Sequence, residues 1–309
     1  MAGKMLFVAS TRSHILAFHL PYLKAFRADG WTIHTAWGGP DGEVPYADQT
    51  LPLPLKKNIC SPGNFRATHI LRKIIRAEGY DAIIVHTTLA AFFTRLALLG
   101  LKQRPHVINM VHGYLVDDQT GRLKRDLMLA AERLTAPVTD LVLTMNQWDH
   151  ETALRLRLGR QVEFIPGIGV DYSRLDSGTP QASEQLCKTF FIPQNAFVLF
   201  FAAEFSANKS QEVLIRALKL LPPHVVLVLA GQGDCQSQCR ALAKQLDLGD
   251  RVIFPGFVTD IGQWYALADA VVSSSRKEGL PFNIMEAMYC GLPVVASVAK
   301  GHSDLIQFF

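Results

Sequence analysis

The chain has 309 residues, of which 49% are hydrophobic and 19% are charged. This composition is typical of a globular protein and excludes disordered, collagen-like and disulfide-rich classes. At about 100–200 residues per domain, the length predicts two domains. No uninterrupted apolar run approaches the roughly 18 residues that a membrane span needs. The five cysteines are odd in number and scattered, which favours a reduced, cytosolic protein.

Positive charge is concentrated in the N-terminal half. Through Val170 the chain carries 20 Lys/Arg and 14 Asp/Glu, a balance of +6, and the remainder carries 11 and 13, a balance of −2, so the whole chain has +4. A basic half suggests an anionic partner, such as a phospholipid surface, a lipid diphosphate or nucleic acid; the alternative is a basic solvated surface. Short Lys/Arg runs and the lack of RNA-binding or zinc-finger signatures argue against nucleic acid.

Short apolar runs alternate with amphipathic segments along the chain. Strands are predicted at 5–9, 31–36, 82–85, 106–110, 141–144 and 162–165, and then at 197–201, 225–230, 251–254, 270–273 and 293–296. Helices are predicted at 65–78, 89–100, 124–135, 146–158, 211–221 and 235–246. The first run resembles a short signal sequence, but polar residues follow it at once, so we interpret it as a buried strand.

The order of these elements predicts the fold class. Continuous apolar strands separated by helices are typical of parallel sheets that are covered on both faces. The pattern restarts after residues 166–194, a stretch of glycines and polar residues without strong periodicity, which we interpret as a hinge. We therefore predict an α/β protein with two Rossmann-like lobes, residues 1–170 and 171–309, and a cleft between them.

Two glutamates lie around a predicted helix start in the second lobe. Glu278 precedes the helix, Pro281 suits its first position and Glu286 lies inside it. The free N–H groups and the dipole of a helix N-terminus form an anion site. A ligand whose diphosphate occupies that site could meet one carboxylate on each side. The alternative is a capped surface helix with two solvated glutamates.

This pattern resembles a known family. The Glu278 to Glu286 spacing is similar to the E-x7-E signature of retaining glycosyltransferases with the GT-B architecture, the family 4 group. Further similar segments are 203–210, 231–233, 255–257, 285–293 and 301–306 in the second lobe. In the first lobe, 10–15, 18–23, 86–88, 111–114 and 165–171 resemble exopolysaccharide and capsule enzymes.

The resemblance implies both a fold and an activity. The first lobe would face the acceptor, and the second would bind the donor. The enzyme would move a sugar from a nucleotide-diphosphate donor, most often UDP-linked, to a polysaccharide or polyprenyl-diphosphate-linked acceptor. It would be cytoplasmic and peripheral on the inner face of the cell membrane. The chain contains no Asp-x-Asp and no cluster with metal-ligand spacing, so we expect transfer without a metal or cofactor.

The resemblance also implies roles for residues of the second lobe. Glu286 would bind the donor ribose, Glu278 would lie by the donor sugar, and Lys209 would meet the diphosphate. Many relatives carry an arginine where this chain has Glu204, so a second cation from that loop is not expected. The full donor-binding set is Glu286, Lys209, Gly231, Gly233, Phe257, Gly279, Leu280, Phe282 and Asn283.

First-lobe residues complete the implied site. His112 follows a predicted strand and would touch the donor sugar, which makes Glu278, His112 and Lys209 the expected catalytic set. The acceptor-side candidates are Ser10, Thr11, His14 and His19. For each histidine the alternative is a structural, packed ring.

The chain departs from the family pattern at its end. Relatives continue beyond the segment that ends at Ile306, whereas this chain stops at Phe309. We expect an incomplete second lobe with Phe308 and Phe309 exposed; a compact family member or a partial chain is the alternative. Two other functions stay open: an inactive fragment that binds nucleotide-sugar, and a GT-B nucleotide-sugar epimerase.

Overall fold

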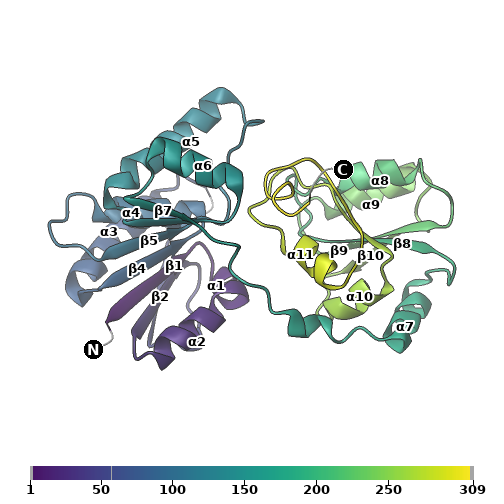
Figure 1. The fold of residues 1–309 in the computed structure, drawn as a ribbon, viewed down its shortest axis with the longest axis horizontal. Helices are drawn as coiled ribbons and strands as arrows, with labels where there is room; N and C mark the ends of the chain where they lie inside the picture. The colour runs from purple at the N-terminus through teal and green to yellow at the C-terminus, as the bar shows by residue number, and fades with distance from the viewer. Residues whose placement is uncertain (1–2, 57, 307–309) are drawn as a thin grey trace. The chain divides into compact units, whose positions relative to one another are not determined.

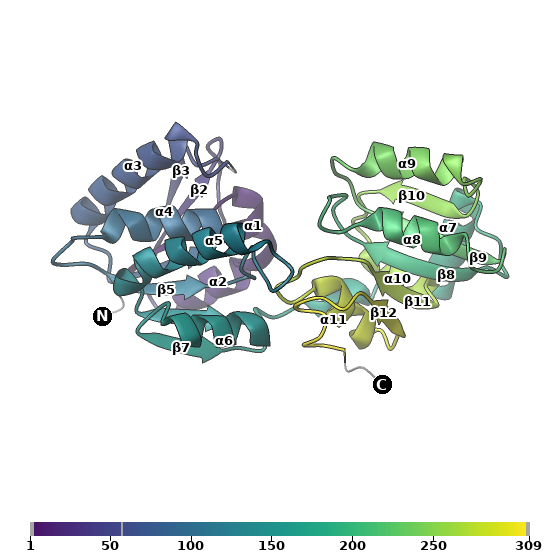
Figure 2. The ribbon, with the colours of Figure 1, turned by 90° about the horizontal axis from the view of Figure 1, so that it is seen from above.

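The computed structural model describes residues 3–56 and 58–306. The chain divides into two compact units, Met1–Ile168 and Gly169–Phe309 (Figure 1). The division falls two residues before the boundary that the sequence suggested. In each unit helices cover both faces of a parallel sheet (Figure 2), which is the predicted α/β architecture.

The described residues of the first unit form a seven-stranded sheet in the order β3-β2-β1-β4-β5-β6-β7. Its strands are β1 (Lys4–Ala9), β2 (Thr32–Gly38), β3 (Gln49–Leu53), β4 (Ala82–His86), β5 (His106–Met110), β6 (Leu141–Thr144) and β7 (Gln161–Phe164). Its α-helices are α1 (Arg12–Phe18), α2 (Leu20–Ala28), α3 (Pro62–Glu78), α4 (Thr88–Leu98), α5 (Arg122–Thr135) and α6 (Gln147–Leu156). The order reverses between β1 and β4, and parallel sheets bind ligands at such a switch point.

The central strand β1 shows why the sheet has a helix layer on each face. Leu6 and Val8 pack against α3 and α4 on one side, and Phe7 packs against α1 and α2 on the other. Because side chains of a strand alternate between faces, a strand buried on both sides must be apolar throughout. The interpretation of the N-terminal apolar run as a buried strand is confirmed.

A buried ion pair joins α4 to α5. The Arg95 guanidinium is fully buried, and its Nη2 lies 2.7 Å from Glu132 Oε2. Arg95 Nε also donates to the carbonyl of Ala91 at 3.1 Å. A charge inside a protein is tolerated when it is paired and hydrogen-bonded, so removing either partner leaves the other charge uncompensated.

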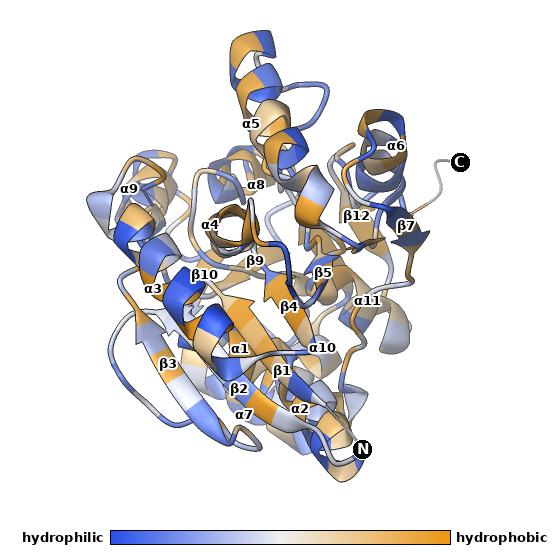
Figure 3. Ribbon diagram, turned by 90° about the vertical axis from the view of Figure 1, so that its left-hand side faces the viewer, coloured by the Kyte–Doolittle hydropathy of each residue, from blue (hydrophilic) through white to orange (hydrophobic). Residues whose placement is uncertain are grey.

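The outer face of α5 is amphipathic. Leu123 and Leu127 are 86% and 69% exposed, and they alternate with the basic residues Arg122, Lys124 and Arg125. Figure 3 shows this mixture of hydrophobic and hydrophilic positions along the helix. Within the described residues, no helix is both long and apolar enough to cross a bilayer.

In the described residues of the second unit, five strands form a sheet in the order β10-β9-β8-β11-β12. They are β8 (Phe197–Ala202), β9 (Val225–Ala230), β10 (Val252–Gly256), β11 (Ala270–Ser273) and β12 (Val294–Ala296). The α-helices are α7 (Pro180–Phe190), α8 (Gln211–Leu218), α9 (Gln236–Gln245), α10 (Ile261–Leu267) and α11 (Phe282–Tyr289). Along β8, Val198 and Phe200 face α7 and α10, whereas Phe201 faces α8 and α9. The strand order reverses between β8 and β11.

Several elements differ from the predicted ones. The stretch predicted as a hinge contains a short 3₁₀ helix (Tyr172–Leu175) and α7, which begins with Pro180 behind the capping side chain of Thr179. These are recognisable helix-start signals, but the apolar residues of α7 are only partly buried, and they lie among polar residues that we interpreted as a hinge. β3 was not predicted because it is an edge strand that contains Pro52. The predicted exposure of Phe308 and Phe309 lies outside the described residues.

Candidate functional site

The loops after β8, β11 and β12 meet at the carboxyl edge of the second sheet. The backbone N–H of Arg276 donates to the carbonyl of Asn208 at 2.8 Å, and that of Glu278 donates to Lys300 at 3.1 Å. The three loops are therefore fixed to one another by main-chain hydrogen bonds. A site built from them is preorganised, because its side chains start from positions that are already restrained.

Lys209 and Glu278, two of the predicted catalytic residues, form an ion pair in this loop cluster. Lys209 Nζ lies 2.5 Å from Glu278 Oε1, and both side chains are largely buried. Gly301, which has φ of +84°, packs against this pair: a Cβ added there would lie 2.8 Å from the Cβ of Glu278. Only glycine allows the loop after β12 to approach this closely.

Glu286 lies in α11 and is buried, with a different set of partners. Its Oε2 accepts a hydrogen bond from Tyr265 Oη at 2.7 Å, and its Oε1 pairs with Arg174. Burial raises the pKa of Tyr265, so this hydroxyl keeps its proton and remains a donor. Arg174 is half exposed and comes from the 3₁₀ helix, in the stretch predicted as a hinge. No sequence pattern indicated Arg174 or Tyr265 as partners of Glu286.

The start of α11 lies one residue later than predicted. Phe282 is its first residue, and Pro281 occupies the cap position without a side-chain cap. Of the other predicted donor residues, Gly279 and Leu280 lie in the loop before the helix and Asn283 lies in its first turn. The N-terminal N–H groups of α11 are consistent with the predicted anion site.

Gly231, Gly233 and Phe257 follow β9 and β10. A Cβ on Gly231 would lie 2.0 Å from the carbonyl oxygen of Ala203, and one on Gly233 would lie 2.3 Å from that of Phe205. Both glycines therefore let the loop after β9 press against the loop that leads to Lys209. Phe257 is 72% exposed, so its ring is accessible rather than part of the core.

In the first unit, Ser10 and Thr11 follow β1 at the switch point. Ser10 Oγ lies 2.6 Å from Thr87 Oγ1, and Thr11 Oγ1 accepts the N–H of His14 at 3.3 Å, which caps α1. Thr87 has φ of +63°, a rare conformation for a β-branched residue. Such strain is often found at functional sites, and Thr87 was not among the predicted site residues.

Four histidines converge beside these residues. His14 comes from α1, His19 lies between α1 and α2, His86 ends β4, and His112 follows β5. One ring nitrogen from each lies within 4.8 Å of one from every other, and His86 Nδ1 is 3.1 Å from His112 Nε2. These histidines have no metal-ligand spacing along the sequence, but the switch point brings them together from distant segments of the chain.

Burial makes these imidazoles poor bases. It lowers the pKa of His14 to about 4, and together with His14 it lowers the pKa of His19 and of His112 to about 3. The pKa of the fully buried His86 also falls well below its usual value, mainly through burial. All four rings are therefore neutral at neutral pH, and each offers a nitrogen lone pair.

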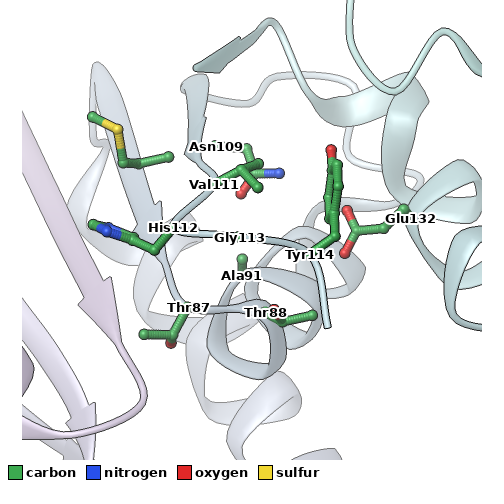
Figure 4. Close-up of a pocket in the computed structure, with 10 residues that line it drawn as sticks. Thr87, Thr88, Ala91, Asn109, Val111, His112, Gly113, Tyr114 and Glu132 are labelled. Atoms are coloured by element: carbon green, nitrogen blue, oxygen red, sulfur yellow. The ribbon is translucent and has the colours of Figure 1, made fainter. Parts of the chain in front are cut away.

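A small cavity adjoins His112. Its volume is about 30 Å³, and its lining includes Thr87, Ala91, Tyr114 and Glu132. Figure 4 shows Tyr114 and Glu132 side by side at one end and His112 at the other. A volume of about 30 Å³ accommodates about one water molecule, so the cavity is too small for a sugar.

Comparisons with known proteins identify the family. A glycosyl transferase 4-like domain matches residues 20–167, and the family of glycosyl transferases group 1 matches residues 183–308. The chain is 32% identical over 312 residues to EpsD of Bacillus subtilis, assigned as a glycosyltransferase, and this match covers 99% of the chain and 82% of EpsD. The chain belongs to the group 1 glycosyltransferases, as the sequence motifs predicted, and is an enzyme of that class.

Other relatives and solved structures agree with this assignment. The chain is 23% identical over 263 residues to an Escherichia coli α-1,3-galactosyltransferase named for UDP-Gal and a GlcNAc-diphosphoundecaprenol, covering 82% of this chain and 67% of the relative. Among structures, HepE of Anabaena with bound UDP and glucose superimposes with a TM-score of 0.76 at 22% identity, covering 99% of this chain and 83% of HepE. The predicted GT-B fold is confirmed.

Proposed function

We propose that this enzyme transfers a sugar, with retention of its anomeric configuration, from UDP to a polysaccharide or polyprenyl-diphosphate-linked acceptor. The observation that carries the proposal is the ion pair between Lys209, in the loop after β8, and Glu278, in the loop that leads into α11, with Glu286 inside that helix. The HepE structures hold UDP or UDP-glucose, and the E. coli relative is named for a lipid-diphosphate acceptor, which supports both substrate classes.

Each of the three residues suits one part of the donor. The Lys209 ammonium would meet the diphosphate, where negative charge develops as the sugar leaves. The Glu278 carboxylate, which already contacts Lys209, would lie by the sugar and stabilise positive charge at its anomeric carbon. Glu286 would accept both ribose hydroxyls, since a carboxylate can accept several hydrogen bonds.

Replacement of Glu286 tests the assignment of the ribose. Glu286→Ala should weaken UDP binding by about 1.5–3 kcal/mol, because a hydrogen bond to a charged acceptor is lost. Each 1.4 kcal/mol is tenfold in affinity, so calorimetry should detect a loss of about 10- to 150-fold. Glu286→Gln preserves the shape of the side chain and an acceptor for Tyr265, so it should lose less UDP affinity than Glu286→Ala. Unchanged UDP affinity in a Glu286→Ala protein with wild-type melting would contradict the assignment.

The first unit carries the proposed acceptor-side residues. His112 is proposed to contact the donor sugar, and Ser10, Thr11, His14 and His19 to line the acceptor side. Of the last two, His19 is buried against His86, whereas His14 is partly exposed. His14 is therefore the better placed of the two for a contact with an acceptor.

A turnover assay distinguishes the three candidate functions. The purified chain is incubated with UDP-sugars, with and without a polyprenyl-diphosphate-linked saccharide, and products are followed by mass spectrometry and NMR. Acceptor-dependent product with a retained anomeric centre is the expected result. A new nucleotide-sugar formed without acceptor would indicate an epimerase, and binding of UDP-sugar without turnover would indicate an inactive fragment.

We further propose that α5 rests on the anionic cytoplasmic face of the membrane. Leu123 and Leu127 would enter the interface, and Arg122, Lys124 and Arg125 would meet phosphate groups. An amphipathic helix with a basic polar face binds in this way, and each basic residue contributes about 1 kcal/mol near an anionic surface. The surplus of positive charge in this half of the chain is consistent with the same orientation.

Vesicle binding tests the role of α5. The wild-type chain should co-sediment with vesicles rich in phosphatidylglycerol more than with neutral ones, and the preference should fade as salt shortens the Debye length from about 10 Å at 0.1 M to about 3 Å at 1 M. The double variant Leu123→Asp/Leu127→Asp should lose most binding. Leu220→Asp, at an equally exposed leucine of the second unit, is the matched control. Equal binding to neutral vesicles would refute the proposal.

A further inference from the structure

We propose that His14, His19, His86 and His112 hold a divalent transition-metal ion, and that Zn²⁺ is the ion the cluster fits best. This ion would tie the α1–α2 segment to the ends of β4 and β5 at the switch point of the first sheet. The inference goes beyond the proposed function, because sugar transfer as described needs no metal.

The spacing of the four rings approximates that of a tetrahedral site. With Zn–N bonds of about 2.0–2.1 Å, four tetrahedral ligand nitrogens lie about 3.3 Å apart and the ring centres about 5 Å apart. The ring centroids of the four histidines are 3.8 to 6.3 Å apart. The nitrogens are within 4.8 Å of one another, and the tightest contact, between His86 and His112, is 3.1 Å. Small side-chain rotations would close this arrangement around an ion.

Unpartnered nitrogens provide an independent argument. The Nε2 atoms of His14, His19 and His86 are buried and have no hydrogen-bond partner among the described residues. Burying a polar atom without a partner costs free energy, so such atoms are rare and call for an explanation. An ion bound through Nε2 of His14 and Nε2 of His19 would satisfy both of those atoms at once.

The ligand chemistry selects the class of metal. Four imidazoles and no carboxylate favour Zn²⁺, Cu²⁺, Ni²⁺ or Fe²⁺ over Mg²⁺ and Ca²⁺, which prefer oxygen. Four protein ligands complete a tetrahedral shell, which is typical of structural rather than catalytic zinc.

Metal binding is compatible with the proposed contact between His112 and the donor sugar. A metal-bound imidazole uses one nitrogen for the ion and keeps an N–H donor on the other. The ion would also fix the direction of that ring and of the loop after β5. The alternative is a metal-free stack of packed imidazoles, in which the ring of His86 stacks on Phe7 and also packs against His19.

The binding experiment uses the full chain without a polyhistidine tag. Cys60→Ser/Cys290→Ser removes the two exposed thiols, which could bind zinc elsewhere. After treatment with a chelator, the protein is titrated with Zn²⁺ by calorimetry and with Co²⁺ by visible absorption. We expect one ion per chain, the intense absorption of tetrahedral cobalt, and a higher melting temperature with Zn²⁺.

Variants then locate the ion. His19→Phe and His86→Phe keep aromatic rings in the cluster but remove a ligand, and each should weaken Zn²⁺ binding by at least about 100-fold, since loss of even an outer partner costs about 10–100-fold. His69→Gln, at an exposed histidine of α3, is the matched control and should bind as before. His14→Cys should keep stoichiometric binding and add a thiolate-to-cobalt absorption band.

Each outcome decides the proposal. Absence of stoichiometric binding by the wild-type chain would overturn it and leave the packed stack. Binding that persists at full affinity in folded His19→Phe and His86→Phe proteins would place the ion elsewhere and would also overturn it. UDP affinity is measured in the same samples and tests the donor site of the second unit separately. Failure of the donor site and failure of the metal site are therefore distinguishable.

Discussion

Lys209→Ala is expected to lower the turnover number by about 10²- to 10³-fold, the usual cost of removing one group that stabilises charge in a transition state. Affinity for uridine should change little, because the nucleoside lacks the diphosphate that Lys209 is proposed to meet. The measurements are initial rates with saturating UDP-sugar and calorimetry with uridine. Removing the ammonium also leaves Glu278 without its 2.5 Å partner, so melting curves of the variant are needed beside the rates.

A neighbouring cation provides the control. Arg276 lies in the loop after β11, but its Nε bonds to Ser210 Oγ at 2.8 Å and its guanidinium faces Glu212 at 3.8 Å. Arg276→Ala should therefore change turnover only slightly. Wild-type turnover in the Lys209→Ala enzyme would mean that the loop after β8 is a structural turn. A large loss of turnover in Arg276→Ala instead would indicate that Arg276, rather than Lys209, contacts the diphosphate.

Arg95→Met should destabilise the first unit by about 3–5 kcal/mol, because Glu132 would remain charged and buried without its partner. The effect should appear as faster hydrogen exchange of first-unit peptides, with second-unit peptides as an internal reference. This readout is preferable to a single melting temperature, because a chain of two units need not unfold in one transition.

The double variant Arg95→Met/Glu132→Leu, compared with the two single variants, forms a double-mutant cycle. When both charges are replaced by apolar groups of similar volume, the desolvation cost disappears and stability should return close to that of the wild type. The coupling between the two sites is then the difference between the double variant and the sum of the single ones. A double variant as unstable as its two single variants combined would show that the pair does not act as a unit.

The fold was predictable because its central strands are buried on both faces. β1, β8 and β9 are continuous apolar runs in the sequence. They lack the alternation of apolar and polar residues that is typical of a strand with one exposed face. The short helix α10, with seven residues, offers too few turns for a period to be recognised. β3 was not predicted from the sequence, because an edge strand tolerates proline and polar residues.

The candidate site was predictable where its residues belong to a local sequence motif, as Lys209 and Glu278 do. The spacing of Glu278 and Glu286 is a local pattern, so it can be recognised before folding. The partners of Glu286 come from other elements: Arg174 from a stretch that lacked periodicity and Tyr265 from α10. The histidine cluster shows the same limit, since only the strand order brings the end of β4 beside α1.

The ion pair between Lys209 and Glu278 has a consequence for how the enzyme would release its product. Because the two charges compensate each other, we expect the resting site to bind phosphate and other small anions weakly. In the proposed binding mode, a donor would bring sugar hydroxyls to the carboxylate while its diphosphate met the ammonium. After transfer, UDP would lack those hydroxyls, and its negative charge would face Glu278 directly. Like charges repel at short range, so the same carboxylate that would assist departure of the sugar would also help to expel the spent nucleotide.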